Sequence, residues 1–525
     1  MVVAQSLRRF SWALCSLSLV ASCTRSTATQ PRSEALVGGI TVDSEVNNVL
    51  IIRGDVECTG FLVNSQWAMT ARHCISSVLA ANPGAITVGL GGTRSSPSQT
   101  TTVAEVIRSP AGFDLALLRL TTPFTVLGNP YFQLQAYPTY SDEILKTTQL
   151  TQVNCYGWGV TNAVAPPPDR PTMITVILAG LAPPLLRLES ASSSTPIGRG
   201  DAGGLCVVPN LGSERANLAL AVIVGQDGMG NGIAIDLTNL PIRAWIEANL
   251  TTRDPDIAAN AASLPAAASP GGQEIDLFWV DAAGSMNQSR LQPDGPTISL
   301  GQLSDDPFTP ARPAAAYLGD QLHVFGRTVS GRILERVSSS SASGEWTPIP
   351  SLPAVDSGVG LASWPPNRLD VFARTVDQQL IHVLGDGTSW NNAEVIGGTS
   401  DTDLFAAWDT DTSVHVFSII GGHVFHKWFN QYWQPGPLTW LGGDVTGTLN
   451  GAGSIVVEHF DVFDMFGRGV NGHLVHKGYV IGWVDDFADL GLAVPSDPIA
   501  VIAAARIHIF SRNPDGTLWH AHLPR

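Results

Sequence analysis

Short apolar runs separated by polar turns fill residues 36–250. Residues 48–52 (NVLII) and 115–120 (LALLRL) are two examples, each bounded by Gly, Ser, Thr or Asn within a few positions. Runs of this length between turn residues are typical of strands in a barrel or sandwich. Residues 239–250 (NLPIRAWIEANL) differ, because Asn239 suits an N-cap, a proline follows in the first turn, and apolar positions recur on one face. We expect a helix there.

A different pattern follows residue 272. A strand of alternating character, built around a phenylalanine, recurs every 45–47 residues from Phe278 onward. Its later copies are residues 322–327 (LHVFGR), 369–374 (LDVFAR), 414–417 (VHVF), 460–463 (FDVF) and 507–510 (IHIF). A period of this length with about four strands per unit is typical of β-propeller blades. The repeat predicts about six blades, but five or seven stay open, because the first and last units each lack a strand.

Residues 251–272 (TTRDPDIAANAASLPAAASPGG) are rich in Ala, Pro and Ser and contain no aromatic residue. A stretch of this composition is typical of a linker between domains. We therefore expect one domain over residues 36–250, a linker over 251–272, and a propeller over 273–525.

The N-terminus has the features of an export signal. Two arginines precede residues 10–21, an apolar run that is too short to span a bilayer comfortably. Residues 20–23 (VASC) then resemble a bacterial lipobox, which implies lipidation of Cys23 and a propeptide or tether over 24–35. An ordinary signal peptide, with Cys23 incidental, is the alternative. Either reading predicts a protein that leaves the cytoplasm, as an outer-membrane or cell-surface lipoprotein or as a secreted protein.

Composition narrows the choice of partners. Charged residues make up 14% of the chain, the net charge is -16, and there are 52 glycines and 35 prolines. Few charges and many turn residues favour all-β domains built from short strands. The acidic balance argues against nucleic acid as a partner. Because no Cys/His cluster has zinc-ligand spacing, we expect neither a metal nor a cofactor.

Five motifs then occur in one order over residues 36–250. They are residues 70–74 (TARHC), 113–118 (FDLALL), 156–159 (YGWG), 200–204 (GDAGG) and 232–246. Together they resemble the conserved segments of trypsin-like serine proteases. The fold that this resemblance implies is all-β, a chymotrypsin-like double β-barrel followed by the propeller.

The resemblance assigns roles to four residues. His73 stands in the place of the general base, and Asp114 in the place of the carboxylate that orients it. The backbone N–H groups of Gly200 and Ala202 stand in the place of the oxyanion hole. Ala202 also occupies the nucleophile position, where a methyl group cannot attack a carbonyl. The resemblance therefore implies an inactive protease homologue, and His73 and Asp114 are then either a purely structural pair or part of a peptide-binding cleft.

Two further departures agree with inactivity. The family frees a terminal amine by cleavage after Arg or Lys, and that amine pairs with the aspartate before the serine. Here Leu36 follows Ala35, so the pairing of Leu36 with Asp201 is in doubt. Pro196 stands at the base of the primary specificity pocket, so specificity for Lys or Arg is not expected.

Six cysteines are present, and Cys15 and Cys23 belong to the export segment. The other four lie before residue 207 and predict two disulfides, with three pairings open from the spacing. The resemblance to trypsin-like proteases implies the pairs Cys58–Cys74 and Cys155–Cys206.

The repeat frame, with Trp and Gly-Gly after the second strand, resembles the tryptophan-rich propellers that include PLL-like fucose-binding lectins. This implies glycans or glycoproteins as partners, because a sugar stacks its apolar face on an aromatic ring. The candidate platforms are Trp390, Trp433, Trp440, Trp483 and Trp519. Alternatively, each tryptophan only packs between blades.

Three functional hypotheses follow. The first is an exported pseudoprotease with a lectin-like propeller, acting as a surface binding protein. The second is an active trypsin-like endopeptidase targeted by its propeller, which requires that Ala202 is not the natural residue. The third is a structural surface protein with neither activity.

Overall fold

The computed structural model describes the chain from residue 39 to residue 524, with gaps. The gaps are 45–47, 111, 126–151, 160–167, 181–183, 190–196, 199, 209–217, 228, 230, 238, 293–294, 305–307, 340–341, 365–366, 409–412, 431, 435–443, 460–461, 481–482, 484–485 and 505. The predicted export segment, with Cys23, and the predicted terminus at Leu36 lie outside the described residues. Within them, neither α-helix is long and apolar enough to cross a bilayer.

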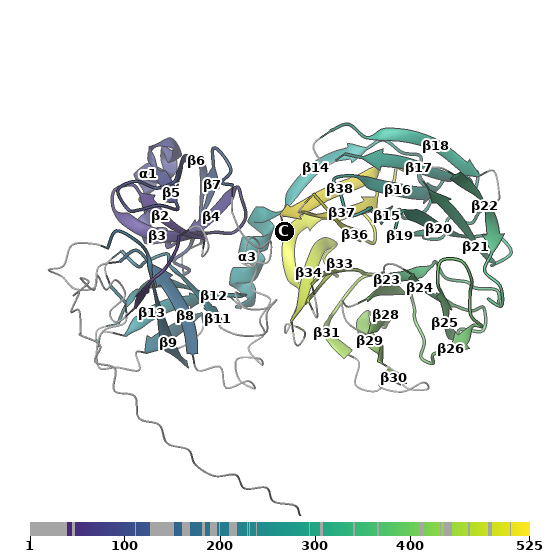
Figure 1. Cartoon of the computed structure of the whole chain (residues 1–525). Helices are drawn as coiled ribbons and strands as arrows, with labels where there is room; N and C mark the ends of the chain where they lie inside the picture. The colour runs from purple at the N-terminus through teal and green to yellow at the C-terminus, as the bar shows by residue number, and fades with distance from the viewer. Residues whose placement is uncertain are drawn as a thin grey trace, which may run out of the picture. The chain divides into compact units, whose positions relative to one another are not determined.

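The first barrel is closed and contains six strands in the order β2-β3-β4-β7-β6-β5 (Figure 1). Their bounds are β2 Val49–Arg53, β3 Glu57–Leu62, β4 Trp67–Thr70, β5 Thr87–Leu90, β6 Gln99–Arg108 and β7 Ala116–Leu120. Aliphatic side chains such as Leu50, Val88 and Leu118 fill its interior. The 3-10 helix η1 (Arg72–Cys74), the helix α1 (Ser77–Ala81) and the 3-10 helix η2 (Pro83–Ala85) connect β4 to β5.

The second barrel has strands β8 Gln152–Gly157, β9 Thr172–Gly180, β10 Leu185–Glu189, β11 Leu205–Val208, β12 Leu218–Gln226 and β13 Gly232–Asp236. They follow the order β9-β10-β13-β12-β11-β8, and the pairing of β8 with β9 closes the barrel, while β1 (Ile40–Thr41) adds to β9. The predicted helix is confirmed as α3 (Leu240–Leu250). Its residues Ile242, Ile246 and Leu250 pack into a core that includes Phe61 of the first barrel. The expected double β-barrel is therefore confirmed.

The remaining strands form a propeller of six sheets in the described residues (Figure 1). Blade 1 is β15–β18, blade 2 β19–β22, blade 3 β23–β26, blade 4 β27–β31 and blade 5 β32–β35, and blade 6 joins β36–β38 to β14. The bounds, in chain order, are β14 Thr252–Ile257, β15 Ala266–Ala268, β16 Ile275–Val280, β17 Met286–Leu291, β18 Ile298–Ser304, β19 Ala314–Leu318, β20 Gln321–Arg327, β21 Ile333–Ser339, β22 Ala342–Pro348, β23 Gly360–Trp364, β24 Arg368–Arg374, β25 Leu380–Gly385, β26 Glu394–Val395, β27 Phe405–Trp408, β28 Val414–Ile420, β29 His423–Asn430, β30 Tyr432–Gln434, β31 Asp444–Thr448, β32 Ser454–His459, β33 Val462–Arg468, β34 His473–Val480, β35 Ala488–Ala493, β36 Ile499–Ala503, β37 Arg506–Arg512 and β38 Leu518–Pro524.

Two propeller strands lie in the stretch predicted as a linker, so that prediction is wrong. Strand β14 pairs with β38, with Thr252 opposite His522, and completes the last blade. Strand β15 pairs with β16 and is the missing inner strand of the first blade. Strand β14 (TRDPDI) is mostly polar and contains a proline, and β15 consists of three alanines, so neither shows the apolar alternation that marks a strand. The two strands that come first in the propeller sequence, β14 and β15, thus complete the last and the first blade and close the ring. The number of blades is six.

The register of the fifth repeat also needs correction. The sequence predicts that Phe463 is the equivalent of Phe417, whereas β33 places Phe466 opposite His476. The same opposition joins Phe417 to His426 in blade 4. The frame of blade 5 is therefore residues 463–468 (FDMFGR), which is displaced by three positions from the predicted frame.

Every blade contains a polar pair at one repeated position. One member lies two residues before the repeated phenylalanine, and the other lies opposite that phenylalanine on the next strand. The pairs are Asp276–Gln288, His323–Glu335, Asp370–His382, His415–His426, Asp464–His476 and His508–His520, with hydrogen-bond distances of 2.6 to 3.1 Å. Because buried polar groups need partners, these pairs explain most of the histidines in the repeat as structural residues.

Candidate functional site

His73 and Asp114 lie together at the junction of the two barrels. His73 belongs to η1, and Asp114 lies just before β7. One oxygen of Asp114 accepts the backbone N–H of His73 at 2.9 Å, and the other lies 2.7 Å from Nδ1 of the ring. A proton on Nδ1 leaves Nε2 as the acceptor, which is the tautomer that a general base requires. The structure thus brings together the two residues that the resemblance pairs.

This pair is open to solvent. The side chain of His73 is 49% exposed and that of Asp114 is 33% exposed. The hydrogen bond to Asp114 raises the pKa of His73 against the opposing effect of burial. Burial acts to raise the pKa of Asp114, but the bonds from His73 outweigh it and the pKa is lowered. The pair is therefore stabilised in its charged form while it can still exchange protons with water.

Residues 200–204 form a tight turn against the first barrel. Gly200 and Gly203 have φ values of +99° and +88°, which favour glycine. A Cβ on Gly203 would lie 2.0 Å from the carbonyl oxygen of Thr59. Thr59 also donates its N–H to Ala202 O at 3.0 Å and its hydroxyl to Gly200 O at 2.7 Å. Thr59, which sequence reasoning missed, therefore fixes the turn that carries Ala202.

The amide groups predicted for the oxyanion hole remain available. In the described part of the chain, the N–H groups of Gly200 and Ala202 donate no hydrogen bond to protein. Two N–H groups that make no internal bond at a fixed turn can receive a carbonyl oxygen. Among the described residues, the turn thus has two N–H groups without a protein acceptor, and the side chain at position 202 is a methyl group.

Asp201 belongs to this turn, and its side chain is completely buried. Its carboxylate accepts the N–H groups of Gly159 and Gly198, each at 2.7 Å. A Cβ on Gly157 would lie 2.0 Å from the same carboxylate, which explains why the 156–159 motif is rich in glycine. Burial raises the pKa of Asp201 to about 7, and the backbone bonds oppose this only in part. Its predicted partner Leu36 and the pocket residue Pro196 lie outside the described residues.

The two expected disulfides are confirmed. Cys58 joins Cys74 and so ties β3 to the segment that carries His73. Cys155 joins Cys206 and ties β8 to β11, next to the 200–204 turn. Cys58, Cys74 and His73 lie within 4.8 Å of one another, but sulfur atoms in a disulfide are not thiolate ligands, so this cluster does not fit a metal ion.

The predicted sugar platforms have different surroundings. Trp390 packs edge-on against Phe325 of the preceding blade and donates its N–H to Glu335 at 2.8 Å. Trp483 packs in the same way against Phe417. Trp519 is buried beneath the guanidinium of Arg253, and Trp440 and the side chain of Trp433 lie outside the described residues. The described tryptophans of this set therefore all have packing contacts.

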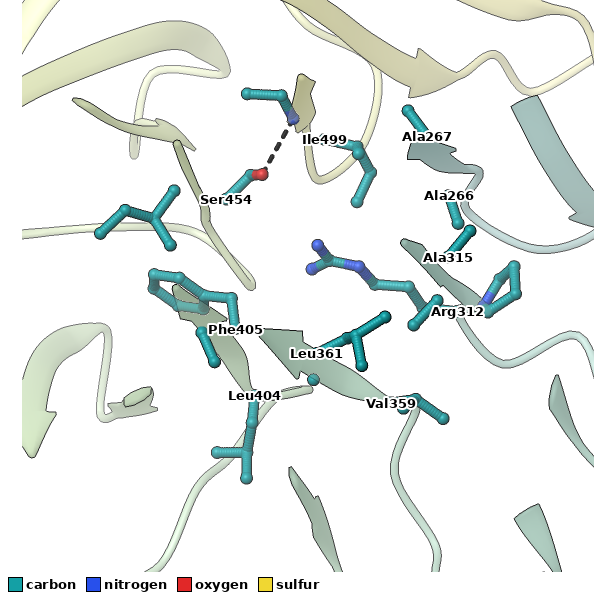
Figure 2. Close-up of a pocket in the computed structure, with 16 residues that line it drawn as sticks. Ala266, Ala267, Arg312, Ala315, Val359, Leu361, Leu404, Phe405, Ser454 and Ile499 are labelled. Atoms are coloured by element: carbon teal, nitrogen blue, oxygen red, sulfur yellow. Dashed lines mark hydrogen bonds between the residues drawn. The ribbon is translucent and has the colours of Figure 1, made fainter. Parts of the chain in front are cut away.

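A cavity of about 100 Å³ occupies the centre of the propeller (Figure 2). It is lined by the inner strands and by Arg312, whose side chain points into the space. Nη1 of Arg312 donates to Gly453 O at 3.1 Å, which links blade 2 to blade 5. Asp403 and Asp497 favour the charged guanidinium, although burial is the larger effect and lowers its pKa. This arginine therefore bridges opposite sides of the ring.

The two barrels, the His73–Asp114 pair and the 200–204 turn define a chymotrypsin-fold protease homologue, which is joined to a six-bladed propeller. Residues 31–180 match the family model described as Trypsin. Human heparin binding protein aligns with 20% identity over 40% of this chain and 95% of its own, at a TM-score of 0.33. The scabies mite inactivated protease paralogue S-D1 aligns with 15% identity over 40% of this chain and 97% of its own, also at 0.33.

Proposed function

We propose that the chain is an exported surface protein whose trypsin-like domain holds peptide without cleaving it and whose propeller binds carbohydrate. The observation that carries the proposal is Ala202. Covalent peptide hydrolysis needs a hydroxyl or thiol at this turn, and a methyl group has neither a lone pair to attack with nor a proton to give. Loss of a triad member leaves only about 10³- to 10⁴-fold acceleration over water, which is too little for a protease.

The surroundings of Ala202 support a retained cleft. Thr59 holds the turn through two hydrogen bonds, and His73 keeps its bond to Asp114 at 2.7 Å. The His73–Asp114 pair is open to solvent, and the N–H groups of Gly200 and Ala202 have no acceptor among the residues that the structure describes. Such groups can still bind a peptide carbonyl and hold the chain in place.

Turnover of a fluorescent casein by the purified full chain tests this proposal. We expect the natural chain to release no more fluorescence than its His73→Ala variant. Ala202→Ser is expected to gain activity that His73→Ala then removes. Turnover by the natural chain that depends on His73 would instead make it an active endopeptidase.

The propeller's carbohydrate binding is supported by two half-buried indoles, those of Trp390 and Trp483, at blade junctions. An indole that is partly open to solvent can stack on the apolar face of a sugar. Binding of the full chain to a glycan array, compared with Trp390→Ala, tests this. The proposal predicts glycans whose array signal falls at least about tenfold in the variant. Loss of the aromatic contact, about 0.5–1.5 kcal/mol, together with loss of the area that the ring buries against the sugar, accounts for such a decrease. An array without signal removes the lectin role.

Export and tethering rest on Arg8, Arg9 and Cys23 in the N-terminal segment. Mass spectrometry of the mature chain from a bacterial membrane fraction tests this part of the proposal. Lipidation predicts an acylated Cys23 at the N-terminus, and Cys23→Ala should release the protein from the membrane. A mature chain that begins elsewhere, with no lipid, would show an ordinary secreted protein.

A further inference from the structure

A cavity of about 380 Å³ opens beside the His73–Asp114 pair. Residues of the first barrel line one side, namely Arg72, Arg108 and Phe113. Strands of the second barrel line the other side through Leu185, Val224 and Ile235. The space therefore lies where the two barrels meet, and its two walls differ in chemistry. Its volume is within the range of about 300 to 1,000 Å³ that is typical of ligand sites.

The first wall carries positive charge that the protein does not neutralise. Arg72 donates to Pro110 O at 3.2 Å, and Nε of Arg108 is buried without a hydrogen-bond acceptor. In the described part of the chain, neither arginine forms an ion pair. A buried N–H without an acceptor destabilises the fold unless a ligand or water supplies the acceptor. In a chain of net charge -16, two such arginines on one cavity favour an anionic ligand.

Asp114 does not cancel this charge. Both of its oxygens are engaged by His73, one by the backbone N–H and one by the ring. The carboxylate also faces the imidazole, whose pKa is raised by the same contact. The negative charge of Asp114 is thus compensated locally, and the guanidinium groups remain for a ligand.

The opposite wall is apolar. Ile235 is buried in a core cluster that the two barrels share, and the partly buried Val224 and Leu185 pack against that cluster. Aliphatic side chains at the edge of a cavity favour an apolar ligand group, because contact removes apolar surface from water. The cavity therefore offers an anion site next to an apolar surface.

We propose that this cavity binds a peptide in which a carboxylate lies next to an aliphatic side chain. The carboxylate contacts Arg108 and Arg72, and the aliphatic side chain contacts Leu185 and Val224. The inference rests on the proposed function, in which the cleft holds peptide without cleaving it. The carboxylate has two sources, an internal Asp or Glu side chain and the C-terminus of a protein.

Four fluorescein-labelled peptides distinguish these sources by fluorescence anisotropy with the full chain. Two are C-terminally amidated and contain internal Leu-Glu or Leu-Gln. The other two end in leucine, either with a free carboxylate or amidated. We expect one carboxylate peptide to bind at least about tenfold more tightly than its neutral partner, as expected for a hydrogen bond to a charged group.

Variants locate the binding. Arg108→Met should weaken the carboxylate peptide about tenfold or more and leave the neutral peptide unchanged, while Arg108→Lys should retain part of the difference. Arg119→Met is the matched control, because Arg119 pairs with Glu105 and does not line the cavity. Its binding should equal that of the natural chain, and circular dichroism confirms that each variant is folded.

Two results would overturn the inference. One is equal binding of charged and neutral peptides, and the other is binding of none of the four. Neither result bears on the missing nucleophile, which the casein assay decides separately. Conversely, a chain that cleaves casein through His73 would overturn the proposed function even if Arg108 selected acidic peptides.

Discussion

Two imidazole–carboxylate pairs of the same length occur in the two halves of this protein. His73 lies 2.7 Å from Asp114 in the trypsin-like domain, and His382 lies 2.7 Å from Asp370 in blade 3. The exposed fractions of their side chains differ greatly, at 49% and 33% for the first pair and 6% and 0% for the second. The distance within a pair therefore says little about its role, whereas its access to solvent and to a cavity does.

The buried pair has no capacity left for chemistry. Asp370 also accepts the indole N–H of Trp408 at 2.5 Å and two N–H groups of Arg368 at 3.0 and 3.1 Å. His382 uses its second nitrogen for Glu394. By contrast, the only hydrogen-bonding neighbour of Nε2 of His73 in the described residues is Sγ of Cys74, at 3.9 Å. The first network holds blades together, whereas the second pair is open to solvent at the junction of the two barrels.

The largest expected difference between the pairs is in stability. Asp370→Ala leaves the N–H groups of His382, Trp408 and Arg368 without their shared acceptor and should cost about 3–5 kcal/mol. Asp114→Ala removes a half-exposed partner and should cost at most about 1 kcal/mol. Urea unfolding of the full chain, followed by tryptophan fluorescence, measures both. Equal losses would show that burial does not separate the two pairs.

A smaller effect on the free energy of unfolding is expected from a change in pH, and it arises from two histidines in blade 6. Burial and neighbouring positive charges lower the pKa of His508 to about 3, and burial lowers that of His520 to about 4. The unfolded chain binds these protons near pH 6.5. The stability that these two neutral histidines contribute is therefore fully present above pH 6.5, and it is lost as the pH falls toward 4 and 3.

His508→Gln tests this sign, since glutamine keeps a hydrogen-bonding group that does not titrate. The urea midpoint of the variant should depend less on pH between 6.5 and 4 than that of the natural chain. The contribution of His382 to stability changes with pH in the opposite direction, because its contacts with Asp370 and Glu394 outweigh burial and raise its pKa. Its contribution is complete below pH 6.5 and is lost as the pH rises. An unchanged acid profile in His508→Gln would contradict the assignment to blade 6.

The smallest effect concerns the pKa of His73. Asp114→Asn removes the carboxylate that raises it, so the pKa should fall toward 6.5. Titration of the ring protons by NMR measures the change, with His73→Ala to assign the signals. A pKa that stays raised in Asp114→Asn would mean that the hydrogen bond to Asp114 is not its cause.

The sequence allowed prediction of the fold wherever motifs or repeats were strong. The five ordered motifs led to the double barrel and to both disulfides, and the phenylalanine repeat led to the propeller. The sequence failed at β14 and β15, because a strand of three alanines carries no apolar alternation. It also misplaced the frame of blade 5, because Phe463 and Phe466 both fit the same pattern.

The candidate site was predictable only where a motif marked it. His73, Asp114 and the 200–204 turn lie in recognisable segments, so their proximity followed from the family resemblance. Arg108 and Thr59 lie in no such segment, and Leu185 and Val224 meet Arg108 only through the packing of one barrel on the other. Contacts between strands that are distant in sequence leave no local pattern to find.

The most direct test of the missing nucleophile is covalent labelling with a fluorophosphonate, measured by intact mass. The natural chain should gain no mass, whereas Ala202→Ser should gain one phosphonyl group, and Ala202→Ser combined with His73→Ala should gain none. Labelling of the natural chain that disappears in His73→Ala would contradict the account. An Ala202→Ser chain that stays unlabelled would show instead that the turn and the His73–Asp114 pair are not arranged for catalysis, and it would leave the natural chain inactive.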